Sequence, residues 1–349
     1  MGRNYKNLIR LFFVILLSPL VNFSKVASQT TDKTLAFNAL SIHDGFSQGM
    51  VVRIFQDRYG LMWFATLDGV NCYDGYNFTV YRHDAHDQSS ITESFAQFFY
   101  EDSQDRLWIG TISGGLDLFD RETETFIHIK HQQGIKTSLS QGSINSIAEH
   151  KDGKLWVQIS NKFDKVTIIT NQIDGTKRFF IEHINVPFKS ESSFLVSTKS
   201  GNIYYVHAIG GVVYKIDNSN INKWTVAVNV DDYHQQNKKT DSSIYRIVQL
   251  LEDTVQNKCY IFYDGGVIKF DETTGLFEKS FQNDFFKDLL KPMYGSIDKQ
   301  GAVWFSGQQN ISIFDTRSGK LKFATAKYST TKRHIKHSHS TYIDRSGLL

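Results

Sequence analysis

The sequence contains few cysteines, few prolines and no long apolar run after its first residues. Its 349 residues include two cysteines, Cys72 and Cys259, which belong to no cysteine cluster. A cysteine-based zinc site is therefore unsupported, and both side chains are expected to be small core residues. Three prolines occur, and no low-complexity linker or second transmembrane segment is visible.

The charges are almost balanced once the first 28 residues are set aside. The chain has 39 basic and 36 acidic residues. Residues 1–28 hold four basic residues and no acidic one, which leaves 35 against 36 and a net charge of −1 for the rest. This balance does not indicate binding to nucleic acid or to an anionic membrane surface.

Residues 1–28 have the organisation of a secretory signal peptide. The apolar stretch 11–21 is too short to span a bilayer, and cleavage is predicted between Ser28 and Gln29. An uncleaved anchor stays open as an alternative, and either form predicts an exported protein. The basic region that precedes the apolar stretch is formed by Arg3, Lys6 and Arg10.

The usual motifs of catalytic chemistry are absent. No G-x-S-x-G, P-loop or H-E-x-x-H sequence occurs. The segment 333–339 contains His334, His337 and His339, but the basic residues beside them favour a solvated loop over a metal site. The repeated Asp residues do not have the spacing of a calcium loop. No catalytic residue, metal site or cofactor is therefore predicted.

The chain does contain a repeated peptide, D-x-x-G-x-x-W-[IF]-[AG]-T, followed by a glycine turn and an aromatic-Asp pair. The aromatic anchors recur about every 48 residues, which indicates one supersecondary module stacked several times. In two degenerate copies a Tyr stands in place of the Trp. The anchors of the repeat are Asp57, Gly60, Trp63, Asp102, Trp108, Trp156, Tyr204, Tyr260, Asp298, Gly301 and Trp304.

Each copy predicts four short antiparallel strands. In the first copy, Asp57 is placed to accept hydrogen bonds from the turn that follows it, and Gly60 tolerates positive φ. Four strands in a unit of this length are typical of a propeller blade. The Trp is expected to face the neighbouring blade. The strands expected in this copy are 51–56, 61–66, 70–73 and 78–81.

The ends of the chain predict how the ring closes. Residues 344–349 begin a seventh copy, so the sequence is interpreted as a fragment of a longer protein. Phe37–Ile42 corresponds to an outer strand and is expected to complete that last blade. We therefore predict an all-β, seven-bladed propeller over 29–349, made of six blades and the start of a seventh, which closes poorly in this fragment.

The segments 45–51, 56–71, 73–76 and 107–116 closely resemble the two-component regulator propeller repeat. This family forms the periplasmic sensor region of hybrid two-component histidine kinases in Bacteroidetes. The resemblance implies two consecutive propellers, a small β-sandwich, a membrane helix and a cytoplasmic output domain in the complete protein. It also implies a homodimer on the periplasmic side of the inner membrane that senses an oligosaccharide and signals through a phosphorelay.

A ligand of such a propeller is expected at one mouth of the central channel, although no individual ligand-binding residue is predicted. Two other functions stay open: an exported propeller enzyme acting on glycans, and a secreted protein-binding scaffold. The enzyme would need converging carboxylates, whereas the repeated Asps lie in separate turns. The loops expected at the mouth are Leu67–Gly69, Ile112–Gly115 and Ser160–Asp164 within blades, and Arg82–Glu93 and Lys130–Gly142 between blades.

Overall fold

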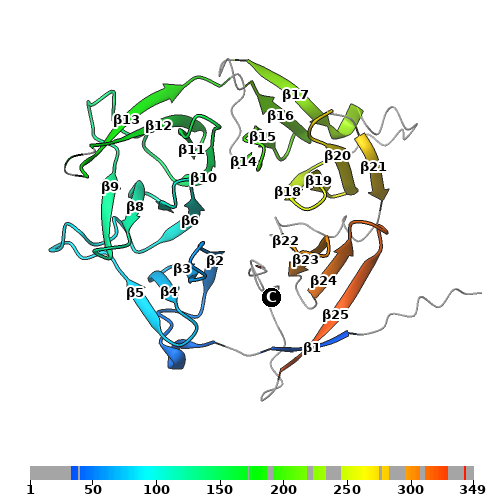
Figure 1. Cartoon of the computed structure of the whole chain (residues 1–349), viewed down its shortest axis with the longest axis horizontal. Helices are drawn as coiled ribbons and strands as arrows, with labels where there is room; N and C mark the ends of the chain where they lie inside the picture. Colours follow the sequence, from blue (N-terminus) through cyan, green and yellow to red (C-terminus); the bar gives the residue numbers. More distant parts are fainter. Residues whose placement is uncertain are drawn as a thin grey trace, which may run out of the picture. The chain divides into compact units, whose positions relative to one another are not determined.

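The part of the chain that the structure describes is an all-β propeller with six blades (Figure 1). Five blades are four-stranded antiparallel sheets, and the sixth sheet has a fifth strand. No helix in the described part of the chain has the length and hydropathy that a membrane span requires. The computed structural model describes residues 33–37, 40–171, 173, 175–186, 192–217, 223–232, 245–274, 277–282, 295–306, 311–328 and 342.

Each blade is a simple meander of consecutive strands. Blade 1 comprises β2 (Val51–Gln56), β3 (Met62–Thr66), β4 (Gly69–Tyr73) and β5 (Phe78–Tyr81). Blade 2 comprises β6 (Ala96–Glu101), β7 (Leu107–Thr111), β8 (Leu116–Asp120) and β9 (Thr125–Ile129). Blade 3 comprises β10 (Ile144–Glu149), β11 (Leu155–Ile159), β12 (Lys162–Thr170) and β13 (Lys177–Ile184).

The second half of the chain repeats the same order. Blade 4 comprises β14 (Ser193–Ser197), β15 (Ile203–His207), β16 (Val212–Ile216) and β17 (Trp224–Asn229). Blade 5 comprises β18 (Ile247–Asp253), β19 (Lys258–Tyr263), β20 (Gly266–Asp271) and β21 (Phe277–Gln282). Blade 6 comprises β22 (Gly295–Ile297), β23 (Ala302–Ser306), β24 (Ile311–Asp315) and β25 (Leu321–Tyr328).

The first strand of each blade lies innermost (Figure 1), and β2, β6, β10 and β18 each contact the first strand of the next blade. In β2, β6, β10 and β18 the register with the second strand shifts by one residue near the strand start. Such a bulge bends the strand and redirects a side chain. In blades 2 and 3 the residues at the shift, Gln97 and Asn145, line the central channel.

The hydrophobic core lies between blades. Trp63 of blade 1 packs edge-on against Phe119 of blade 2, with ring centroids 5.0 Å apart. Trp108 packs against blade 3 in the same way, and Trp156 against blade 4. Tyr204 and Tyr260 repeat this arrangement in the next two blades. Because each aromatic anchor buries its ring against the neighbour, a blade is stable only within the stack.

The Asp of the D-x-x-G turn accepts hydrogen bonds from both the turn backbone and the Trp anchor. In blade 1 the Asp57 Oδ1 atom accepts hydrogen bonds from the backbone N–H groups of Tyr59 and Leu61, both at 3.0 Å. Its Oδ2 atom accepts the indole N–H of Trp63 at 2.9 Å. Asp102 and Asp298 likewise each accept two backbone N–H groups of their own turn and the indole N–H of Trp108 and Trp304, respectively. Gly60 and Gly301 have φ of 90° and 79°, as the turn requires.

Blade 3 departs from this pattern at the same turn. His150 stands where blades 1, 2 and 6 have Asp, and its Nδ1 atom faces the Asp152 carboxylate at 2.7 Å. The indole N–H of Trp156 and the Nε2 atom of His150 are buried and have no hydrogen-bond partner among the described residues. The anchor ring is therefore packed in blade 3 but its polar atom is unsatisfied.

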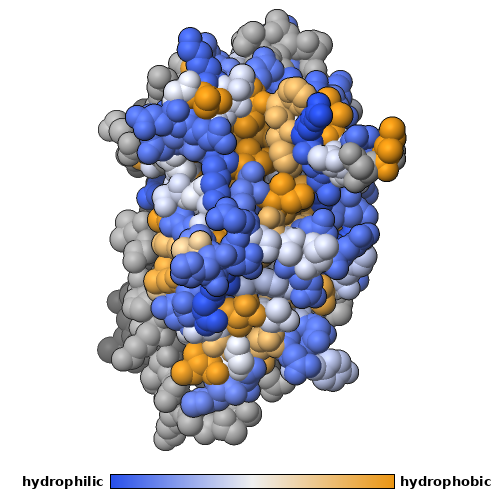
Figure 2. All heavy atoms as spheres, turned by 90° about the vertical axis from the view of Figure 1, so that its left-hand side faces the viewer, coloured by the Kyte–Doolittle hydropathy of each residue, from blue (hydrophilic) through white to orange (hydrophobic). Residues whose placement is uncertain are grey.

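Blade 3 is also extended at its outer edge. Its strands β12 and β13 have nine and eight residues, against five in the equivalent strands of blade 2. The extension exposes Ile169, Ile173 and Phe180. Figure 2, which views the side of β9 and β13, shows apolar side chains lying among hydrophilic ones.

The expected closure is wrong in its strand and in its partner. The N-terminal strand is β1 (Lys33–Phe37), not Phe37–Ile42, and it pairs with β25 at the outer edge of blade 6. Residues 41–45 instead form a capped 3-10 turn, η1 (Ile42–Asp44). Ser41 and Asp44 cap it reciprocally, and Gly45 ends it with φ of 102°. These local bonds remove the segment from any strand.

Six blades are shown, whereas the predicted seventh is not. Its D-x-x-G sequence, the signal peptide with Ser28 and Gln29, and the histidines of 333–339 lie outside the described residues. Cys72 and Cys259 are both buried and free, on strands of different blades.

Candidate functional site

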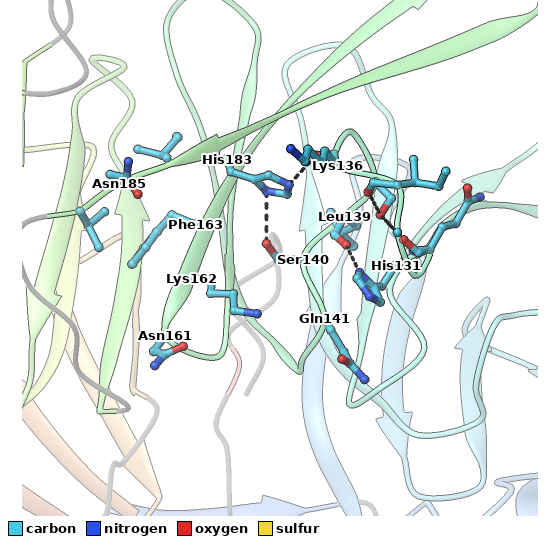
Figure 3. A pocket seen from close by; sticks show the side chains of 16 residues that line it. His131, Lys136, Leu139, Ser140, Gln141, Asn161, Lys162, Phe163, His183 and Asn185 are labelled. Carbon is cyan, nitrogen blue, oxygen red and sulfur yellow. Dashed lines mark hydrogen bonds between the residues drawn. The ribbon is translucent and has the colours of Figure 1, made fainter.

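A pocket of about 530 Å³ opens on blade 3, on the side where the within-blade and between-blade loops meet (Figure 3). It brings together two loops that the sequence placed at the ligand-binding mouth, Lys130–Gly142 and Ser160–Asp164. The end of β13 supplies its third wall, at 183–186. Pockets of 300–1,000 Å³ are typical for small-molecule ligands.

The pocket has cationic and amide side chains set in a lining that is otherwise largely apolar. Lys136, Gln141 and Lys162 are exposed side chains that border it, and none of its lining residues is Asp or Glu. Figure 3 shows Lys162 and Gln141 on one side of the opening, with His183 and Lys136 on the other. The amides of Asn161 and Asn185 also line the pocket and are placed to bond hydroxyl groups.

A buried carboxylate fixes the walls of this pocket. Asp164 has no exposed surface, and it accepts the backbone N–H of Ser140 at 2.6 Å and its hydroxyl at 2.8 Å. The Nδ1 atom of His183, on the neighbouring strand, lies 2.7 Å from the same carboxylate. The His183 Nε2 atom lies 2.8 Å from the carbonyl of Lys136. We call the group Ser140–Asp164–His183 the blade 3 clasp, because it ties the between-blade loop to two strands.

Blade 2 contains the same group at equivalent positions. Asp117 accepts the backbone N–H and the hydroxyl of Thr92 at 2.9 and 2.5 Å. His128, its cross-strand partner, lies 2.6 Å away and faces the carbonyl of Gln88 at 2.9 Å. We call this group the blade 2 clasp. The same arrangement thus occurs in two neighbouring blades.

Blade 1 has a reduced version. The side chain of Asn71 accepts the backbone N–H of Ser47 and donates to its hydroxyl, both at 2.8 Å. Val80 is the cross-strand partner of Asn71, so no imidazole completes the group. The polar pair alone holds the preceding loop here.

The clasps contain the residue types of a hydrolase triad but not its geometry. In such a triad the imidazole contacts the carboxylate with one nitrogen and the hydroxyl with the other. Here the Ser140 hydroxyl and the Asp164 carboxylate both face the Nδ1 atom of His183, and a carbonyl faces Nε2. No ring nitrogen is left to take a proton from the hydroxyl, so the clasp is a structural device.

The histidines of both clasps have a raised pKa. Hydrogen bonding to Asp117 raises the pKa of His128, and hydrogen bonding to Asp164 raises the pKa of His183, each against an opposing effect of burial. A protonated ring donates from both nitrogens, which matches a carboxylate on one side and a carbonyl on the other.

Two further cavities lie elsewhere in the propeller. One of about 440 Å³ occupies the central channel and is bordered by Arg53, Gln97, Asn145 and Arg246. The other, of about 530 Å³, lies between blades 1 and 2. In the described part of the chain, no group of three or more His, Cys, Asp or Glu side chains could hold a metal ion. The charged residues that line the cavity between blades 1 and 2 are Asp74, Arg121, Glu122 and Glu124.

The repeat anchors do not form the blade 3 pocket; they lie in the blade turns and cores. The clasp residues were missed, although the sequence carries a signal for them. A Ser or Thr stands sixteen residues before the anchor Trp in the first three copies, and an Asn or Asp follows that Trp by eight or nine. The Ser or Thr residues are Ser47, Thr92 and Ser140, and the Asn or Asp residues are Asn71, Asp117 and Asp164.

No family model matches the chain. Over 84 residues, 24% of this chain, it is 36% identical to histidine kinase P4 of Formosa agariphila, of which the match covers 6%. Its fold is similar to the extracellular domain of the hybrid two-component system BT3049 from B. thetaiotaomicron, with a TM-score of 0.63 and 21% identity. That similarity covers 89% of this chain and 39% of the other.

Two further solved structures show how widely the fold is shared. The extracellular domain of the hybrid two-component system BT4673 from B. thetaiotaomicron has a TM-score of 0.59 and 15% identity, over 85% of this chain and 36% of its own. A streptogramin B lyase also has a TM-score of 0.59, with 12% identity, over 86% of this chain and 90% of its own. Sequence and fold together agree with the resemblance that the repeat indicates: this chain has the propeller fold of the extracellular domains of hybrid two-component systems, and it spans less than half the length of those relatives.

Proposed function

We propose that this chain is the extracytoplasmic sensor propeller of a membrane-anchored two-component receptor, and that it binds an oligosaccharide in the blade 3 pocket. The observation that carries the proposal is the pocket itself, because it joins the two predicted ligand loops over a fixed base. The amides of Gln141, Asn161 and Asn185 suit the hydroxyl groups of a sugar.

The lyase fold raises an enzyme as the second candidate, since one fold hosts many functions. Glycan cleavage needs a general acid and a base or nucleophile that face the substrate. Among the residues lining the blade 3 pocket there is no carboxylate, and the His183 ring is committed to Asp164 and a carbonyl. The arrangement therefore favours binding without turnover.

A ligand signals only if it binds one state of the receptor better than another. The pocket spans the between-blade loop Lys130–Gly142 and the strand ends of blade 3, so a ligand that bridges them would change how the loop is held. In the proposed receptor this difference reaches a histidine kinase across the membrane, through the pose of two protomers. The homodimer and the membrane anchor are parts of the proposal.

We also infer that the complete ring has seven blades. Tyr342 stands two residues before the D-x-x-G sequence at 344–347, and its hydroxyl lies 3.5 Å from the carbonyl of Gln56 in blade 1. Tyr100 holds the equivalent position in blade 2, and its hydroxyl accepts the backbone N–H of Glu149 in blade 3 at 3.0 Å. Tyr342 thus contacts blade 1 as a preceding blade would.

Calorimetric titration of the full chain with a panel of oligosaccharides tests the binding proposal. We expect one class to bind, and the double variant Gln141→Ala/Asn161→Ala to weaken that binding at least tenfold. The control is Gln104→Ala, an exposed amide in a turn of blade 2. If no oligosaccharide in the panel gives a heat of binding, the oligosaccharide proposal is wrong. If new reducing ends are released during the titration, the chain is an enzyme instead.

A further inference from the structure

We propose that the blade 3 pocket selects an acidic oligosaccharide, whose carboxylate or sulfate group is held between Lys136 and Lys162. This inference rests on the proposed function, because it names the class of ligand for the same site. Its basis is the distribution of charge around the pocket.

The lining is one-sided in charge. It contains two lysines and two histidines, His131 and His183, and no acidic residue. Neither Lys136 nor Lys162 has an ion-pair partner among the described residues, although lysines elsewhere in blade 3, such as Lys165, do pair. Both exposed ammonium groups border one opening, so an anionic ligand that lies between them gains Coulomb attraction from both.

The nearby carboxylate does not cancel this charge. Asp164 lies behind the wall with no exposed surface, and its oxygens accept bonds from Ser140 and His183. Hydrogen bonding to Asp164 raises the pKa of His183, which shifts the imidazole toward the charged form that offsets this carboxylate. The two ammonium groups thus set the field that a ligand meets.

The molecule as a whole is not basic, and the blade 3 pocket shares a positive lining only with the central-channel cavity among the three cavities described, the latter being bordered by Arg53 and Arg246. The chain after residue 28 has a net charge of −1. The cavity between blades 1 and 2, which has the same volume, is bordered by three carboxylates and one guanidinium. The net charge of the chain would not draw an acidic ligand to the protein. The local charges would, because they attract it at the blade 3 pocket and repel it at the cavity between blades 1 and 2.

The neutral groups of the lining complement the two lysines. The amides of Gln141, Asn161 and Asn185 provide donors and acceptors for sugar hydroxyls. A lysine binds an anion as a flexible point charge, so it accepts a planar carboxylate and a tetrahedral sulfate alike. The structure therefore assigns anionic character to the ligand, and the two anions are separated by experiment.

The test is calorimetric titration of the full chain with three disaccharides of one linkage: a uronate, its carboxyl-reduced neutral counterpart and a sulfate ester. We expect at least one acidic form to bind at least tenfold more tightly than the neutral form. Whichever of the uronate and the sulfate ester binds more tightly identifies the anion that the pocket prefers. Raising the salt concentration from 50 to 500 mM should weaken the acidic ligand and leave the neutral one nearly unchanged.

Two variants locate the effect. Lys136→Gln and Lys162→Gln should each reduce the acidic preference at least threefold, and both remain folded because the side chains are exposed. The control is Lys151→Gln, an exposed lysine in the turn between β10 and β11 at the other end of blade 3. Equal binding of neutral and acidic sugars would overturn this inference and leave the sensor proposal standing. Failure of every sugar would overturn both.

Discussion

At the scale of single residues, the central feature of the repeat is an Asp carboxylate that accepts the indole N–H of the Trp anchor. Besides the Arg106 guanidinium, Asp102 serves three donors: the backbone N–H groups of Gln104 and Arg106 and the indole of Trp108. A buried donor that loses its acceptor costs more than an ordinary hydrogen bond contributes. The D-x-x-G-x-x-W spacing thus reflects one shared carboxylate that organises a turn and a core residue together.

Replacing that carboxylate should therefore be strongly destabilising. Asp102→Ala leaves the Trp108 indole and the turn amides without their acceptor, so the free energy of unfolding should fall by about 3 kcal/mol. Urea denaturation followed by tryptophan fluorescence measures the change. Gln104→Ala, in the same turn but exposed, should have little effect; a similar loss in both variants would show that the shared carboxylate is not the cause.

Blade 3 offers the reverse experiment. His150→Asn places a neutral amide oxygen where the Trp156 indole N–H has no partner, and avoids a second carboxylate beside Asp152. The free energy of unfolding should rise by about 1 kcal/mol, as one buried donor is satisfied. His150→Ala supplies no acceptor and should lower it. Thermal melts of both variants decide the matter, and an unchanged or lower melting temperature for the Asn variant would contradict the explanation.

At the scale of elements, the between-blade loops are held by the strands they cross. The clasps of blades 2 and 3 link each loop to the third and fourth strands, through Asp117 with His128 and Asp164 with His183. Blade 1 achieves a similar link without an imidazole. The two histidine clasps should therefore make loop attachment depend on pH.

The direction follows from the raised pKa of His128 and His183. The folded state binds these protons more tightly than the unfolded chain, in which a histidine has a pKa of about 6.5. Their stabilisation is complete below that pH and is lost as the pH rises through the folded pKa. The urea midpoint should thus fall from pH 6 to pH 8.5 more for the native chain than for His128→Gln/His183→Gln. Identical profiles would refute the assignment.

At the scale of the whole molecule, the propeller depends on each blade having a neighbour. Five successive interfaces are filled by the aromatic anchors of blades 1 to 5. On the other side of blade 1, the Tyr342 ring lies edge-on to Phe55, with centroids 6.5 Å apart. A blade in this position would bury the remaining face of blade 1, as the other interfaces do.

This geometry makes the seventh blade testable. A chain extended beyond residue 349 to include one further repeat should unfold at a higher temperature and resist proteolysis better than residues 29–349. The added blade buries apolar surface against blade 1. Tyr342→Ala should remove part of the gain in the extended chain. If extension leaves the melting temperature unchanged, the six-bladed arrangement is sufficient and the inference of a seventh blade is wrong.

The sequence by itself determined the repeat and what the repeat builds. The turn residues and the aromatic anchors specify a four-stranded blade because they interact over short sequence separations, as Asp57 and Trp63 do. Those short separations also explain why the six described blades have the predicted strand order.

Only the tertiary structure decided the rest. The blade 3 pocket depends on Ser140, Asp164 and His183, which meet across a loop and two strands although 43 residues separate the first from the last. The capped turn at Ile42–Asp44 follows from local bonds, whereas the partner of β1 depended on which sheet edge the ring leaves open. Such choices are set by the free energy of the assembled ring, which no local pattern contains.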